Sequence, residues 1–183
     1  MIIGLVGEKL AGKDTVADYM AEKYNASHFR FSHILDAILE ELNLEISRKN
    51  EIDLGLGLRE VFGEHVLINA LEPRVKRSMA GYRVVNGIRM DELDIVKTWG
   101  AKIIYITAPI ETRFERYKNR RGGKSGKTDD AQMDFEHFKE HETCRTELEI
   151  PELGKQADFR IDNTGSLGEL YKKVDEIISK LQN

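Results

Sequence analysis

Short apolar runs alternate with longer segments of helical spacing along most of the chain. Five runs predict strands, and they lie at residues 2–6, 27–31, 82–86, 102–107 and 158–161. In several of these runs consecutive positions are apolar, as in IIGLV and KIIYIT. Such runs are typical of strands that are buried on both faces, which is the usual state of a strand in a parallel sheet.

The segments between these runs have the spacing of helices. Residues 14–24 carry Val16, Ala17, Met20 and Tyr24 on one helical face. Further helices are expected from a cap at Ser32 to residue 42, through most of 43–80 with breaks at Gly55, Gly57, Gly63 and Pro73, over 91–98, after Pro109, over 133–148, and from a cap at Ser166. Strands that alternate with helices predict an α/β fold, with a parallel sheet of about five strands and helices on both faces.

Composition narrows the class of protein. The chain has 183 residues, of which 33% are charged and 40% hydrophobic, so we expect one globular domain over 1–183. A net charge of −4, without aromatic residues among the basic ones, makes nucleic acid an improbable partner. The single cysteine, Cys144, allows no intramolecular disulfide, and no apolar run is long enough to span a bilayer. A cytoplasmic protein is therefore expected.

The most informative segment is GEKLAGKD at residues 7–14, between the first strand and the first helix. It matches G-x-x-x-x-G-K, the motif of phosphate-binding loops, in the strand–loop–helix context that the motif requires. Glycines let the backbone wrap an anion, and successive N–H groups with the helix N-terminus attract phosphate. Lys13 adds a positive charge for the β- and γ-phosphates and is predicted to be catalytic. The predicted ATP-binding residues here are Gly7, Glu8, Lys9, Leu10, Ala11, Gly12, Lys13, Asp14 and Thr15.

The position after the lysine departs from the motif, since it holds Asp14 rather than Ser or Thr. A carboxylate beside phosphate is repelled unless a metal ion lies between them, and Mg²⁺ prefers carboxylate and phosphate oxygens. Asp14 is therefore a predicted Mg²⁺ ligand, with Thr15 as the hydroxyl that contacts phosphate. The alternative is that Asp14 only stabilises the start of the helix, where negative charge is favourable.

The segment GEKLAGKDT, with Asp after the lysine, resembles the loop of deoxynucleoside-monophosphate kinases in the P-loop kinase superfamily. Three later segments resemble that family in the same order: VVNGIR at 84–89, IYITAP at 104–109 followed by TRFER at 112–116, and DNTGSL at 162–167. The resemblance implies the three-layer P-loop NTPase fold, the use of ATP and Mg²⁺, and contacts from Asn163 and Gly165 to the nucleotide base.

Two departures from the related families bear on metal and substrate. The family often has Asp at the end of the third strand, where this chain has Asn86. Because Asn86 lacks that negative charge, Asp14 becomes the main candidate for a metal ligand. Dephospho-coenzyme A kinases carry Asp-Ala-Asp after the second strand, where this chain has Phe31-Ser32-His33. The second departure argues against dephospho-coenzyme A as the phosphate acceptor.

A basic, glycine-containing stretch at about 117–135 has the composition of a mobile lid. A kinase must exclude water and surround the migrating phosphoryl group with cations. Arg113, Arg116 and Arg120 have the spacing i, i+3 and i+7, so they share a helix face. We predict that Arg116 and Arg120 are catalytic contacts to the triphosphate, with Arg121 as a substitute.

The acceptor is expected across the carboxyl edge of the sheet from the phosphate-binding loop. The helical region at about 32–80 is the predicted acceptor-binding insertion, and Arg59, Arg74 and Arg89 are predicted to bind the substrate. His137, His141 and Cys144 also share a helical face, but they lack an evident fourth ligand, so a zinc site is not expected.

These observations predict an ATP-dependent phosphotransferase, most simply a nucleoside or deoxynucleoside monophosphate kinase that acts with Mg²⁺ on small-molecule nucleotides. One alternative is a kinase of another small phosphorylated acceptor, such as dephospho-coenzyme A. The other is a nucleotide-sensing protein that binds without transfer, which the substitutions at Asp14 and Asn86 keep open. ATP against GTP and the oligomeric state are not decided by the sequence.

Overall fold

The five strands form one parallel sheet in the order β2-β3-β1-β4-β5. A computed structural model describes residues 1–119, 134–141 and 148–182. The strands are β1 (Ile2–Val6), β2 (Ser27–Arg30), β3 (Arg83–Asn86), β4 (Lys102–Thr107) and β5 (Phe159–Asp162). The predicted parallel sheet of about five strands, with helices on both faces, is confirmed.

The first strand lies in the middle of the sheet and is buried at all of its positions. It pairs with β3 on one side, with Leu5 opposite Asn86, and with β4 on the other, with Val6 opposite Tyr105. The chain moves from β1 to β2 and β3 on one side and then to β4 and β5 on the other. The end of β1 is therefore the point at which ligands bind in open α/β sheets.

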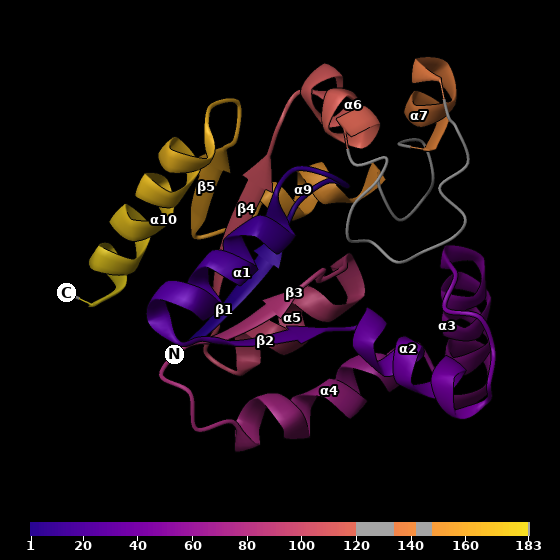
Figure 1. Cartoon of the computed structure of the whole chain (residues 1–183). Coiled ribbons are helices and arrows are strands. Elements are labelled where there is room, and N and C mark those ends of the chain that lie inside the picture. Colours follow the sequence, from indigo (N-terminus) through magenta and orange to yellow (C-terminus); the bar gives the residue numbers. More distant parts are fainter. Residues whose placement is uncertain (120–133, 142–147, 183) are drawn as a thin grey trace.

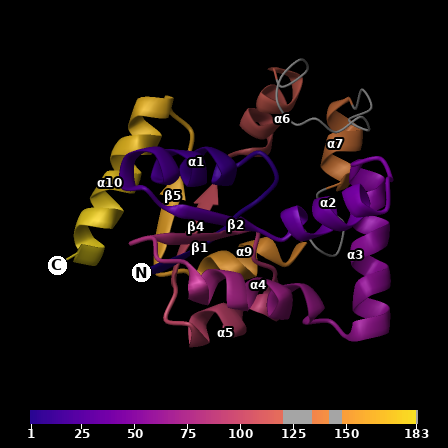
Figure 2. The ribbon, with the colours of Figure 1, turned by 60° about the horizontal axis from the view of Figure 1, so that its bottom comes forward.

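The helices cover the two faces of the sheet (Figures 1 and 2). They are α1 (Lys13–Tyr24), α2 (Ser32–Glu41), α3 (Arg48–Phe62), α4 (Val66–Arg77), α5 (Met90–Thr98), α6 (Ile110–Asn119), α7 (Phe135–His141), α9 (Ile150–Lys155) and α10 (Leu167–Gln182). Figure 2 shows α1 and α10 on one face and α4, α5 and α9 on the other. The helices α2 and α3 lie beyond the carboxyl end of β2 (Figures 1 and 2).

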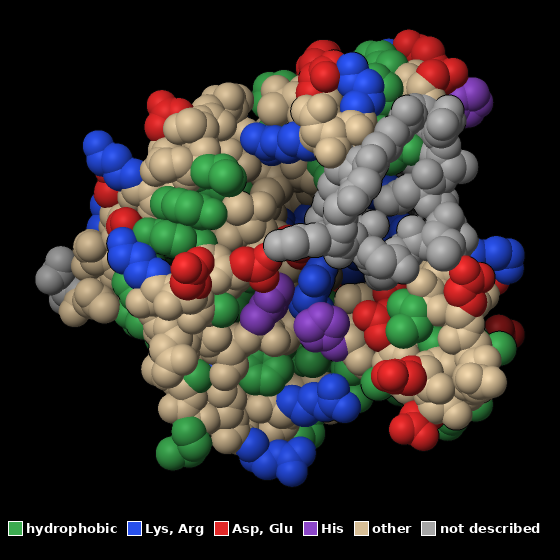
Figure 3. All heavy atoms as spheres, in the orientation of Figure 1, with side chains coloured by type: hydrophobic (Ala, Val, Ile, Leu, Met, Phe, Trp, Pro, Cys, Tyr) green, Lys and Arg blue, Asp and Glu red, His purple; other side chains and the backbone are tan. Residues whose placement is uncertain are grey.

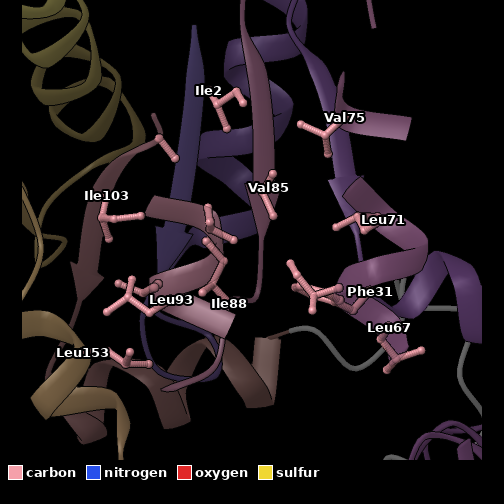
Figure 4. Close-up of a cluster of buried hydrophobic side chains, with 14 of the residues drawn as sticks. Ile2, Phe31, Leu67, Leu71, Val75, Val85, Ile88, Leu93, Ile103 and Leu153 are labelled. Carbon is pink, nitrogen blue, oxygen red and sulfur yellow. The ribbon is translucent and has the colours of Figure 1, made fainter. Parts of the chain in front are cut away.

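Two hydrophobic clusters, one on each face, hold the layers together. On one face Ile3 and Leu5 pack with Val16 of α1 and Val174 of α10. On the other face α4 runs along the sheet, so that Leu67 lies near Phe31 and Val75 lies near Ile2 (Figure 4). Leu93 of α5 and Leu153 of α9 close the same cluster, and burial of these side chains is the main stabilising contribution.

The structure corrects several predicted helix boundaries. Ser32 is the first residue of α2 and makes no capping hydrogen bond. Gly55 and Gly57 lie inside α3, and Gly55 is buried, with Leu35 3.6 Å from where a Cβ would stand. Pro73 lies inside α4, on its exposed side, because the opposite side packs in the core. Only Gly63 ends a helix as predicted.

Near the C-terminus the structure adds one helix and confirms one cap. The short helix α9 was not predicted, and α7 covers only part of the helix expected over 133–148, of which residues 133 and 142–147 lie outside the described residues. The predicted cap at Ser166 is confirmed, since its Oγ accepts from Glu169 N at 3.3 Å and Glu169 Oε2 accepts from Ser166 N at 2.7 Å.

Candidate functional site

The segment between β1 and α1 folds into a tight loop. Its backbone has positive φ at Gly7 (149°), Leu10 (64°) and Gly12 (115°), and Ala11 N donates to Glu8 O at 3.1 Å. A Cβ at residue 7 would stand 2.0 Å from Ile106 O, so only glycine fits there. Left-handed residues beside right-handed ones make a concave nest for anions. Leu10 adopts this conformation at a cost on the order of 1–2 kcal/mol, which the surrounding contacts must offset.

A cavity of about 350 Å³ opens beside this loop and the first turn of α1. Its lining combines loop and helix residues with the segment that follows β5 and one arginine of α6: Leu10, Gly12, Lys13, Asp14, Thr15, Arg116, Asn163, Gly165, Leu167 and Leu170. The structure thus brings Asn163 and Gly165, predicted on the base side, to the same cavity as the loop. The N-terminus of α1 gives this cavity a partial positive charge.

Lys13 is the first residue of α1, and its ammonium group is held against the loop. Its Nζ donates to Gly7 O at 2.6 Å and to Glu8 O at 2.9 Å. These contacts place a positive charge at the mouth of the nest without burying it, since the side chain lies in the cavity lining. The position is suited to a phosphate that lies on the loop amides.

Two arginines of α6 donate hydrogen bonds to backbone carbonyl groups of the loop. The Arg116 guanidinium donates from Nη1 to Leu10 O at 3.1 Å and Ala11 O at 3.2 Å, and from Nη2 to Asn163 O at 2.7 Å. Arg113, which is buried, donates to Ala108 O at 3.0 Å and Lys9 O at 3.3 Å. Burial, reinforced by neighbouring Arg113, lowers the pKa of Arg116, although a guanidinium stays charged in proteins.

The arginine pair was only partly foreseen. The sequence placed Arg113 and Arg116 on one helix face, and both face the loop in the structure. No separate contact was predicted for Arg113, yet it donates to the loop carbonyl of Lys9 and to Ala108 O after β4. Arg120 and Arg121, and most of the predicted lid, lie outside the described residues.

Asn163 joins the loop to the end of β5. Its Nδ2 donates to Ala11 O at 2.8 Å, and its backbone N donates to Thr107 O at 2.7 Å. The side chain is buried, and a Cβ at Gly12 would stand 2.5 Å from its Nδ2. Asn163 therefore has a structural function at the loop in addition to its place in the cavity wall.

Asp14 makes two polar contacts beyond its own helix. Its Oδ1 accepts from Arg30 Nη2 at 3.0 Å and from Asn86 Nδ2 at 2.7 Å, so it joins the carboxyl ends of β2 and β3 to the start of α1. Asp14 is thus more than a helix-start charge. Arg30 was missed by the sequence reasoning, because its pairing with Asp14 depends on the order of strands in the sheet.

His28 lies next to this pair on β2. Its Nε2 is 3.3 Å from Asn86 Nδ2 and its Nδ1 is 3.7 Å from Asp18 Oδ1. Burial, and then the charge of Arg30, lower its pKa, so the ring is neutral at pH 7 and Nε2 accepts from Asn86. Asn86 then donates both amide hydrogens, one to Asp14 and one to His28. Figure 3 shows acidic, basic and histidine side chains gathered in the middle of one face of the molecule.

The predicted acceptor arginines are only partly brought together. Arg59 of α3 lies 3.7 Å from the buried carboxylate of Glu92 in α5, and Glu92 Oε2 accepts from the backbone N of Arg89 at 2.9 Å. The Arg59 guanidinium and the Arg89 backbone N–H thus meet at one carboxylate. Arg74 is exposed and lies in the last turn of α4, the helix that leads to the amino end of β3. Arg74 is therefore at the sheet edge opposite the loop, away from the group it was predicted to join.

Glu8 carries a buried carboxylate beneath the loop. Its Oε1 accepts from Tyr105 OH and from Thr107 Oγ1, the latter at 3.2 Å, whereas Oε2 is buried without a hydrogen-bond partner. Burial, and then the bond to Glu8, raise the pKa of Tyr105, so its hydroxyl remains a donor. These bonds anchor the loop to β4, and sequence spacing gave no signal for them.

The oxygen donors near the cavity fit Mg²⁺ held mainly by a triphosphate. Asp14 and Thr15 both line the cavity and offer a carboxylate and a hydroxyl. Among residues 1–119, 134–141 and 148–182, no group of three or more His, Cys, Asp or Glu side chains is arranged to hold a metal. One carboxylate and one hydroxyl, from Asp14 and Thr15, suit Mg²⁺, which keeps several waters and takes one or two protein ligands plus phosphate oxygens.

The chain is similar to archaeal proteins known only by family labels. It is 28% identical to a UPF0200/UPF0201 protein of Archaeoglobus fulgidus, over 98% of this chain but 55% of that protein. It is 27% identical to a UPF0200 protein of Methanothermobacter thermautotrophicus, over 99% of this chain and 90% of that protein. The chain thus spans about half the length of the first relative and most of the second. No protein-family model matches it.

Solved structures with the same fold include shikimate kinases. The enzyme from Bacteroides thetaiotaomicron has a TM-score of 0.67 at 14% identity and covers 100% of this chain and 99% of its own. The enzyme from Acinetobacter baumannii in complex with shikimate has a TM-score of 0.57 at 17% identity, over 98% and 93% of the two chains. This chain therefore has the P-loop kinase fold that the motif predicted. The comparisons do not extend to the finer resemblance to deoxynucleoside-monophosphate kinases.

One structural finding concerns membranes. Within the part of the chain that the structure describes, every helix is too short or too polar to cross a bilayer.

Proposed function

We propose that this chain is an ATP-dependent phosphotransferase that acts on a small phosphorylated acceptor, most simply a nucleoside or deoxynucleoside monophosphate. The observation that carries the proposal is the phosphate nest at residues 7–14. The nest and the Lys13 side chain border a cavity that extends to Asn163 and Gly165. One continuous site of this kind suits a nucleoside triphosphate, with its phosphates on the loop and its base near residues 163–170.

In this proposal the loop amides and Lys13 bind the β- and γ-phosphates. Arg116 keeps the loop in its curled form and lies close enough to the cavity to contact the triphosphate. Asp14 and Thr15 would hold Mg²⁺, which supplies positive charge to the phosphates when bound. The protein's own work is in-line placement and charge stabilisation, since phosphoryl transfer requires little covalent chemistry from the enzyme.

The acceptor lies across the carboxyl edge of the sheet from the loop. An oxygen of its phosphate forms a bond to the γ-phosphorus while the bond from that phosphorus to the β,γ-bridging oxygen breaks, and ADP leaves. A phosphate acceptor is already ionised at pH 7, so the reaction needs no general base. Arg30, paired with Asp14, and Arg59, paired with Glu92, are the guanidinium groups that could turn to an anionic acceptor on this side.

The test is ADP release, coupled to an optical assay, by the full chain with ATP and Mg²⁺. Each nucleoside and deoxynucleoside monophosphate is added in turn, with dephospho-coenzyme A and shikimate as further acceptors. We expect ADP production that depends on one class of monophosphate and is abolished in Lys13→Ala. Lys180→Met, which removes an exposed lysine at the end of α10, serves as the matched control.

The outcomes separate the rival functions. Turnover with dephospho-coenzyme A or shikimate alone would keep the phosphotransferase and replace the acceptor. Tight ATP binding without acceptor-dependent ADP release from any compound would favour a nucleotide sensor. Full activity in Lys13→Ala would remove the assignment of the site.

A further inference from the structure

Arg30 and Asp14 form an ion pair at the boundary between the two halves of the site. Their Nη2 and Oδ1 atoms are 3.0 Å apart, and each side chain is 35% exposed. Asp14 belongs to the first turn of α1, whereas Arg30 is the last residue of β2, directly before the helices of the proposed acceptor region. The pair therefore joins a predicted metal ligand to an arginine on the acceptor side.

The Asp14 carboxylate cannot bind a metal ion and the Arg30 guanidinium equally well at the same time. A divalent ion on Asp14 would bring positive charge close to the Arg30 guanidinium, and like charges at such distances repel. Other ionisable groups near the pair include Lys13, which lines the same cavity as Asp14, and His28, whose lowered pKa leaves it neutral. Asp18 faces His28, and the ring centroid of His33 is 6.2 Å from that of His28. Asn86, at the end of β3, is uncharged, so it offers Arg30 no second carboxylate when the ion pair with Asp14 is broken.

We propose that Arg30 is an acceptor-phosphate anchor whose availability is controlled by the metal on Asp14. The inference rests on the proposed phosphotransferase function. Without metal the guanidinium is held on Asp14. If Asp14 holds the Mg²⁺ of the bound triphosphate, its carboxylate is no longer available to Arg30, and Arg30 would become the counter-ion of the acceptor phosphate.

This arrangement couples the two substrates. Because metal binding and acceptor binding both break the same ion pair, each makes the other less costly, and the coupling is reciprocal. The geometry therefore implies an order of substrate binding, in which the acceptor phosphate binds well only after the metal–triphosphate complex. This order limits occupation of the acceptor site by monophosphate or free phosphate when no triphosphate is bound. A guanidinium is suited to this task because its fork matches phosphate oxygens as well as carboxylate oxygens.

The test measures binding rather than turnover. Isothermal titration calorimetry gives the affinity of inorganic phosphate, and of the acceptor found by the ADP assay, for the full chain saturated with a non-hydrolysable ATP analogue. Each titration is run with Mg²⁺ and with EDTA. Manganese binding to the same analogue complex is followed separately by electron paramagnetic resonance.

For the wild-type chain we expect Mg²⁺ to raise phosphate and acceptor affinity roughly tenfold, within the usual range of coupling between sites. Arg30→Met should lose that increase and bind Mn²⁺ more tightly, and Arg30→Lys should keep part of it. Asp14→Asn should bind phosphate well even in EDTA and bind Mn²⁺ weakly. Arg77→Met, an exposed arginine on α4, should behave as wild type, and thermal unfolding checks that each variant is folded.

Two results would overturn the inference while leaving the phosphotransferase intact. One is an unchanged Mg²⁺ effect on phosphate and acceptor affinity in Arg30→Met. The other is a phosphate affinity in Asp14→Asn that is as low in EDTA as in the wild-type chain. Failure of the wild-type chain to bind the ATP analogue at all would instead refute the proposed function, and the inference with it.

Discussion

The guanidinium of Arg116 should contribute measurably to stability as well as to nucleotide binding. It donates hydrogen bonds to Leu10 O, Ala11 O and Asn163 O at 3.1, 3.2 and 2.7 Å. Arg116→Met keeps most of the aliphatic stem but leaves these three carbonyls without that donor. Hydrogen bonds to charged groups are worth about 1.5–3 kcal/mol each, but they are not additive and this side chain is partly exposed. We therefore expect a loss of about 2–4 kcal/mol in total.

For a chain of this size each kcal/mol lowers Tm by about 2–4 °C, so the expected decrease is roughly 4–16 °C. Differential scanning calorimetry of wild type, Arg116→Met and Arg116→Lys measures it, and the lysine variant should fall between the other two. Lys118→Met, which removes an exposed positive charge from the same helix, should change Tm little. A decrease of less than about 2 °C in Arg116→Met would refute the assignment of Arg116 as the clamp of the loop.

Three further variants test other parts of the site and the fold. Glu8→Gln should bind ATP roughly two- to tenfold more tightly in calorimetry, because a negative charge below the phosphate nest is removed while the bond from Tyr105 is kept; weaker binding would contradict this. Gly12→Ala should abolish ATP binding and lower Tm, since its Cβ would stand 2.5 Å from Asn163 Nδ2 at a φ of 115°, and a wild-type affinity would show that the loop tolerates another shape. Burial alone would raise the pKa of Asp175, but hydrogen bonds from Lys23, Tyr24 and Tyr19 outweigh it and lower that pKa below 3.8. The charged form therefore stabilises the fold above that pH, so Asp175→Asn should be less stable at pH 7, with a gap that narrows as the pH falls below about 4 in urea titrations; a gap independent of pH would contradict it.

The sheet and the loop could be predicted because their signals are local. A parallel strand buried on both faces is a continuous apolar run, as in β1 and β4, and the loop motif needs only glycines and a lysine at fixed spacing between a strand and a helix. Helix breaks were less predictable because tertiary packing overrides propensity. Pro73 remains inside α4, which buries Leu67, Ile68, Leu71 and Val75 in the core. Gly55 remains inside α3, whose Leu54 and Leu58 are partly buried against the same cluster.

The contacts that shape the site depend on the fold as a whole. Arg30 meets Asp14 only because β2 and β3 lie on the same side of β1, and Tyr105 meets Glu8 because β4 is the other neighbour of β1. The predicted cavity residues Asn163 and Gly165 reach the loop through β5, at the far edge of the sheet. Arg74 has the same residue type as Arg59 but lies near the amino ends of the strands, which sequence spacing alone does not distinguish.

Whether residues 7–14 bind nucleotide phosphates is tested most directly by the affinities of adenosine, AMP, ADP and ATP, each with Mg²⁺, for the wild-type chain and Lys13→Met. If residues 7–14 hold the phosphates, wild-type affinity rises steeply from adenosine to ADP and ATP, and Lys13→Met loses most of that rise while adenosine binds both proteins alike. An affinity that is independent of phosphate number, or unchanged by Lys13→Met, would show that this loop is not a nucleotide phosphate site.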